Sequence, residues 1–83
     1  MPPEILRITE KKHIIPYLEA RQLMQQYEKV KAQLLSGDTF RTSFKELNPQ
    51  NSGIWSFRIN KQFRAHSIFN GNTLRVYKID NHQ

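Results

Sequence analysis

Two arginines, Arg58 and Arg64, stand on either side of a short polar turn, and the sequence closes on Asp80 and His82. In an antiparallel pair of strands, residues at equal distances from the connecting turn face each other across the pair. The two arginines can therefore share one face of a sheet. The hairpin signal Asn70-Gly71 returns the closing residues toward Arg64 by the same geometry. The sequence thus predicts one cluster of two guanidinium groups, a carboxylate and an imidazole.

These are the groups that can cleave RNA without a metal ion. A histidine has an intrinsic pKa near neutrality, so His82 can remove the proton from a ribose 2′-OH. The arginines would stabilise the negative charge that develops on the phosphate oxygens. The plainer interpretation is ordinary surface charge beside a solvated histidine, and spacing alone does not separate the two.

Several other kinds of functional site leave no trace in the sequence. The chain has no cysteine, so it can hold neither a disulfide nor a thiolate zinc site. We find no Gly-rich phosphate loop, no nucleophilic serine motif and no metal-ligand spacing. We therefore expect no metal and no cofactor.

The charge is uneven along the chain. The formal net charge is +6, and residues 41–83 hold seven Lys and Arg against two Asp and Glu, a balance of +5. A basic half suggests a polyanionic partner, either a nucleic acid or an acidic protein that covers the same surface. Beside the cluster, the basic residues expected to contact RNA are Arg41, Lys45, Lys61, Arg75 and Lys78.

The elements that must position these residues follow from hydrophobic periodicity. After a short strand at residues 5–8, an apolar stripe at helical spacing predicts a main helix from about Pro16 that ends at Gly37. Alternation then predicts strands over residues 39–47, 54–60, 63–69 and 74–80. The expected fold is α+β, with an antiparallel sheet of four or five strands packed on an N-terminal helix or helices and one side left open. The 83 residues should make one domain, 1–83.

Within the strand at residues 54–60, Trp55, Phe57 and Ile59 should face the core while Arg58 faces outward. In the last strand, we expect Leu74 and Val76 on one face, with Arg75, Tyr77 and Ile79 on the other. Of the remaining histidines, we interpret His66 as accessory or structural, and we assign His13 no catalytic role.

Two runs resemble a known family: Gly53 to Ala65 (GIWSFRINKQFRA) and Leu74 to His82 (LRVYKIDNH). They are similar to the RelE/ParE toxins of bacterial type II toxin–antitoxin systems, most of all to the RelE and HigB-type mRNA endonuclease branch. The resemblance implies a microbial-ribonuclease-like fold, an antitoxin partner and metal-independent, ribosome-dependent cleavage of mRNA through a cyclic phosphate. It makes Arg58 and Arg64 phosphate-binding residues, and Asp80 and His82 the residues of the family's Asp-x-His ending. Asn81 departs from the pattern, since related toxins often carry a tyrosine there.

Two alternatives stay open at the level of sequence. One is a ParE-like toxin that inhibits DNA gyrase by binding alone, and the other is a non-catalytic basic binding domain of the same fold. The sequence has no apolar run that could span a bilayer and no signal-peptide core at its start, so we expect a soluble cytoplasmic protein.

Overall fold

The computed structural model describes residues 3–81. In chain order its elements are β1 (Arg7–Glu10), α1 (Ile14–Ala20), α2 (Met24–Leu35), β2 (Lys45–Glu46), β3 (Ile54–Arg58), β4 (Phe63–Asn70) and β5 (Thr73–Asn81). Neither helix within this range is long and apolar enough to cross a membrane.

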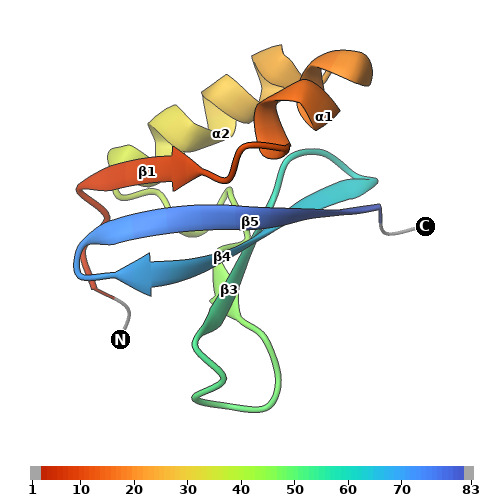
Figure 1. Cartoon of the computed structure of the whole chain (residues 1–83). Helices are drawn as coiled ribbons and strands as arrows, with labels where there is room; N and C mark the ends of the chain where they lie inside the picture. The colour runs from red at the N-terminus through yellow and green to blue at the C-terminus, as the bar shows by residue number, and fades with distance from the viewer. Residues whose placement is uncertain (1–2, 82–83) are drawn as a thin grey trace.

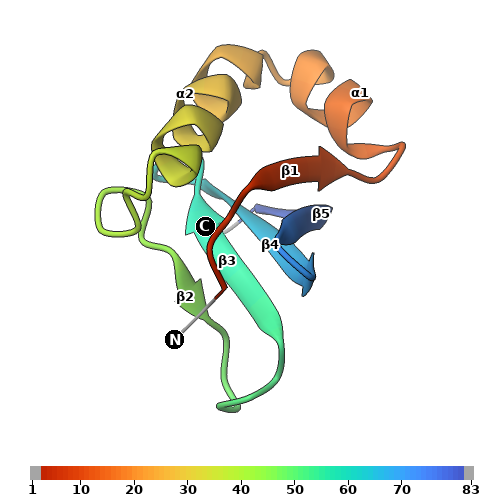
Figure 2. The same ribbon diagram turned by 90° about the vertical axis from the view of Figure 1, so that its left-hand side faces the viewer.

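The five strands form one sheet in the order β1-β5-β4-β3-β2. The pairs β2–β3, β3–β4 and β4–β5 are antiparallel, whereas β1 runs parallel to β5. Both helices lie on the same side of this sheet (Figures 1 and 2). The predicted α+β class is therefore confirmed, and the sheet is mixed because of its first strand.

The core lies between the helices and the sheet. Tyr27 from α2 is fully buried, and its ring stacks on Phe57 of β3 with the centroids 6.5 Å apart. Phe57 and Ile59 are buried as predicted, and half-buried Trp55 stacks on Phe44 at 5.1 Å. The face of β3 that was expected to hold the sheet to the helices does so.

The helical region contains two helices where one main helix was predicted. α1 begins at Ile14, which places Pro16 in the first turn, where a proline is tolerated. The chain then leaves the helix at Gln22, which has a φ of 58°. Its N–H donates to the carbonyl of Glu19, and the N–H of Leu23 donates to that of Leu18. These two bonds form a Schellman motif, the common way for a helix to end.

The same motif ends α2, this time at the predicted residue. Gly37 has a φ of 92°, and the N–H groups of Gly37 and Asp38 donate to the carbonyls of Leu34 and Gln33. The sequence revealed the second stop because glycine favours the left-handed conformation, whereas a glutamine gives no such signal.

The strand predicted over residues 39–47 is largely absent. Only Lys45 and Glu46 form β2, and the chain before them is a turn. The backbone N–H of Arg41 donates to Asp38 Oδ1, and Thr42 Oγ1 donates to the Asp38 carbonyl. Such local side-chain bonds compete with strand pairing. The first strand also differs from its prediction at residues 5–8, since it begins at Arg7.

The faces predicted for the last strand are wrong beyond Val76, because this strand contains a β-bulge. The register of β4 against β5 shifts between His66 and Ser67, which leaves Tyr77 without an opposite residue. Ile79 therefore pairs with Ala65, which in turn pairs with Phe57, so it joins the core face rather than the face of Arg75. One extra residue inverts the alternation of side chains beyond it.

Candidate nucleic-acid interface

A row of charged residues crosses three strands on the side of the sheet away from the helices. Arg58 of β3 pairs with Arg64 of β4, which pairs with Asp80 of β5. Directly opposed residues in antiparallel strands place their side chains on the same face. The structure thus brings together three of the four residues of the predicted cluster. The fourth, His82, lies outside the described residues.

A second row runs beside the first. Lys45 pairs with Ser56, Ser56 with His66, and His66 with Lys78. Arg75 lies on the same side, because it pairs with Ile68, and Ile68 follows His66 by two residues in β4. We call the surface made by these two rows and Arg75 the basic face. Its charges come from four consecutive strands, β2 to β5.

Arg64 is held firmly at the centre of the basic face. Its Nη2 donates to Ser56 Oγ at 3.0 Å and to the Ser43 carbonyl at 3.2 Å. Burial lowers the pKa of the Arg64 guanidinium, and the Arg58 cation lowers it further, while Asp80 opposes both. Both hydrogen bonds use Nη2, so the N–H groups of Nε and Nη1 can still donate to phosphate oxygens, each as a separate charge-assisted hydrogen bond.

His66 is the histidine that the structure places on this face. Its Nε2 is 3.9 Å from Asp80 Oδ2, and its ring lies 6.5 Å from that of Tyr77. Burial lowers the pKa of His66. The neighbouring Asp80 carboxylate raises this pKa and offsets part of the effect of burial, whereas the Lys78 and Arg64 cations lower it further. The imidazole is therefore neutral at pH 7 and able to accept a proton.

The turn between β3 and β4 keeps the two arginines opposite each other. Asn60 Oδ1 accepts hydrogen bonds from the N–H groups of Gln62 and Phe63, both at 2.8 Å. The Gln62 amide then donates to Asn81 Oδ1 at 2.9 Å, which ties the turn to the end of β5. Asn81, the departure from the family pattern, thus has a structural contact here.

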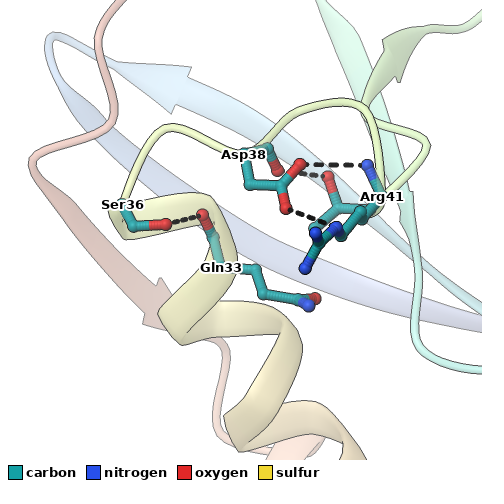
Figure 3. Close-up of polar contacts among 5 residues, drawn as sticks. Gln33, Ser36, Asp38 and Arg41 are labelled. Atoms are coloured by element: carbon teal, nitrogen blue, oxygen red, sulfur yellow. Dashed lines mark hydrogen bonds and ion pairs between the residues drawn. The ribbon is translucent and has the colours of Figure 1, made fainter.

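The other predicted RNA-binding residues divide into two groups. Lys45, Arg75 and Lys78 lie on the basic face, whereas Lys61 is exposed in the turn beside it. Arg41 lies off the sheet, in the turn after α2, where its Nε is 3.7 Å from Asp38 Oδ2 (Figure 3). Among residues 3–81, no group of three His, Cys, Asp or Glu side chains could hold a metal ion.

The position of His66 along its strand already indicates which face of the sheet it lies on. His66 follows Arg64 by two residues, and alternation along a strand places both side chains on one face. The Asp-x-His ending indicated His82 as the titratable group instead. His13, by contrast, is exposed just before α1, away from the basic face.

Comparisons with known proteins bear on the fold. No protein-family model matches the sequence, and no curated protein does. Among solved structures, the YoeB dimer from Staphylococcus aureus is similar, with 15% sequence identity, a TM-score of 0.70, and coverage of 94% of this chain and 98% of that chain. YafQ in the E. coli DinJ–YafQ toxin–antitoxin complex is similar too: the chain from that structure shows 14% identity, a TM-score of 0.68 and 94% coverage of both chains. The chain therefore has the RelE-like fold of these toxins, as the resemblance in its sequence predicted.

Proposed function

We propose that this protein is the toxin of a type II toxin–antitoxin system and that it cleaves mRNA, on the ribosome and without a metal ion. The observation that carries this proposal is the row of Arg58, Arg64 and Asp80 with His66 beside it. The row and its neighbour offer two cations, a carboxylate and a neutral imidazole on the side of the sheet that neither described helix covers.

The chemistry requires a proton acceptor and charge stabilisation. A histidine removes the proton from the ribose 2′-OH, and the resulting oxyanion attacks the adjacent phosphorus. The bond from phosphorus to the 5′ oxygen then breaks, and that oxygen leaves with a proton supplied by an acid. The products are a 2′,3′-cyclic phosphate and a 5′-hydroxyl, while Arg58 and Arg64 stabilise the charge on the phosphate oxygens.

Two histidines are candidates for the proton transfer. His66 is supported by its place beside this row, with its Nε2 3.9 Å from Asp80 Oδ2. His82 is supported by its position in the Asp-x-His ending of the sequence. Substituting each one separately distinguishes them.

The likeness of the fold to YoeB and YafQ supports the assignment as a toxin. YafQ was solved in complex with DinJ, so a cognate antitoxin is the partner that we propose for this chain. An acidic, partly disordered antitoxin segment would match the basic residues of the sheet and could fold as it binds.

The test is expression from an inducible promoter, followed by mapping of RNA 5′ ends in the cell. Wild-type protein should arrest growth and create new 5′-hydroxyl ends within translated mRNA. Arg64→Lys should reduce cleavage about 100-fold, because a lysine keeps the charge but cannot reproduce the fork of the guanidinium. Lys12→Ala removes an exposed cation in the connection between β1 and α1, which is not part of the basic face, and should cleave as the wild type does.

Growth arrest with intact mRNA would contradict this proposal, and DNA damage in the same cells would indicate a gyrase inhibitor instead. Normal growth at high expression would indicate a non-catalytic binding domain. Protein treated with EDTA and then freed of the chelator is added to purified ribosomes programmed with mRNA, which checks separately that cleavage needs no metal bound to the protein.

A further inference from the structure

A cleft outside the basic face lies at the junction of α2, the turn that follows it and the end of β3. Its volume is about 230 Å³. Val30 and Ile59 are largely buried and form its apolar part. Lys29, Arg41 and Arg58 also line it, and all three are exposed.

The lining selects for an anion. None of the described residues that line the cleft is acidic, and the amides of Gln26 and Gln33 add neutral hydrogen-bond donors. Asp38 holds the backbone and Nε of Arg41, which leaves the two outer nitrogens of this guanidinium available (Figure 3). Three cations around one small cleft fit an oxyanion such as a phosphate.

Arg58 connects this cleft to the basic face, because it lines the cleft and also pairs with Arg64 across the sheet. A ligand that occupies both places must carry negative charge at intervals along its length. A single RNA strand does so at every nucleotide. The backbone of β3 is also bound at this point, since the N–H of Arg58 donates to the Thr42 carbonyl at 2.8 Å.

We propose that Lys29, Arg41 and Arg58 bind a second phosphate of the same RNA strand, one that is not cleaved. This inference rests on the proposed function for the identity of its ligand and extends it to a binding site on α2. The strand would cross the basic face at Arg64 and continue over the edge of the sheet to the helix.

The test couples one side chain to one phosphate. A short RNA carries 2′-O-methyl groups throughout, so that it cannot be cleaved, and each phosphate in turn is replaced by a neutral methylphosphonate. Binding is measured by fluorescence anisotropy for the wild type and for Lys29→Gln and Arg41→Gln. Lys12→Gln is the matched control, because it removes an exposed cation elsewhere.

The expected result is one phosphate, away from the position that is cleaved, whose neutralisation weakens the binding of wild type but not of Lys29→Gln. The slope of log K against log salt is negative, and its magnitude should decrease by about 0.7 in Lys29→Gln and in Arg41→Gln, as expected for one lost phosphate contact to a single strand. In Lys12→Gln the slope should stay at the wild-type value.

Three results would overturn the inference. One is that neutralising each phosphate weakens RNA binding by the same factor in wild type and in Lys29→Gln. Another is that the protein does not bind RNA even at low salt. The third is a variant that binds RNA normally but loses affinity for a polyglutamate peptide, which would assign the cleft to an acidic protein. The binding test does not depend on cleavage, because the RNA cannot be cleaved. If Lys29 is coupled to one phosphate in a protein that shows no nuclease activity, the proposed function is refuted while the phosphate site in the cleft is supported.

Discussion

The imidazole of His66 is surrounded by groups that act on its charge in opposite directions. Burial and the cations Lys78 and Arg64 disfavour the imidazolium, whereas Asp80 favours it, and burial has the largest effect. A histidine in such a position responds to pH through both folding and chemistry. Its folding response can be measured without any substrate.

We expect His66 to make the protein less stable in mild acid. Its pKa in the folded protein lies below the ordinary 6.5, so below pH 6.5 the unfolded chain binds a proton more readily than the folded one. The stabilisation is present above pH 6.5 and is lost as the pH falls toward the folded pKa. Urea unfolding should show a smaller loss between pH 7.5 and pH 5.5 for His66→Gln than for wild type.

His13→Gln is the control for this measurement, because His13 is exposed before α1. Its pH dependence should match that of wild type. Identical pH dependence in His66→Gln and wild type would show that His66 has the same pKa in the folded and unfolded states.

At the scale of residues, the sequence predicted that Arg58 faces Arg64, and it placed Asp80 near Arg64 without fixing the register. Equal distances from the turn at residues 60–62 put the two arginines opposite each other. Beyond the hairpin signal Asn70-Gly71, an unbroken register would put Ile79 opposite Arg64, and the bulge at Tyr77 brings Asp80 there instead. The environment of His66 was beyond the sequence, since its burial depends on how the side chains of neighbouring strands pack around it.

Among the elements, the break between α1 and α2 stands out because a glutamine occupies a left-handed position. A side chain with a Cβ is strained there by roughly 1–2 kcal/mol, and glycine is not. Gln22→Gly should therefore raise the free energy of unfolding by about 0.5–1 kcal/mol after its own loss of chain entropy.

The matched control is Gln25→Gly, in the first turns of α2. There the same substitution falls in a regular helix and should lower stability by up to about 1 kcal/mol. Urea unfolding monitored by circular dichroism compares the two. Destabilisation of equal size by both substitutions would contradict the role of Gln22 as a helix end.

The turn between β3 and β4 depends on the carbonyl oxygen of one side chain. Asn60→Ala removes both hydrogen bonds that Asn60 Oδ1 accepts, as well as the bond from Nδ2 to Gln26 Oε1 at 3.1 Å, so it should cost about 2 kcal/mol. Asn60→Asp keeps the acceptor and should recover most of this stability. If the aspartate variant unfolds as easily as the alanine variant, the turn does not depend on this oxygen.

The elements that the sequence predicted poorly share a physical reason. Gln22 ends a helix without a glycine, and the turn at residues 39–44 alternates like a strand while its polar groups bond locally. The bulge at Tyr77 leaves no mark on composition. In each case neither the composition nor the alternation of the sequence reveals the conformation that the folded chain adopts.

Over the whole molecule, stability depends on one core shared by both helices and the sheet. A domain of this length has about 4–12 kcal/mol of stability. Phe57 is fully buried against Tyr27, so Phe57→Ala should cost about 3–5 kcal/mol and bring the protein close to unfolding at 25 °C.

Phe40→Ala is the matched control for this prediction, since the same atoms are removed from a side chain that is 90% exposed. Its effect should stay within about 0.5 kcal/mol of wild type. Chemical unfolding measures the free energy of unfolding of both variants. A similar decrease in both would show that Phe57 is not part of the core.

The place of β5 in the sheet has a consequence for how the protein is made. β5 pairs with both β1 and β4, and its residues Leu74 and Val76 are fully buried, yet it is synthesised after the other four strands. A nascent chain that ends before β5 leaves β1 without its partner strand and lacks Asp80. Because a domain folds once its parts have emerged, the basic face is completed only after β5 has left the ribosome. The proposed activity therefore cannot appear before β5 has been made and has emerged.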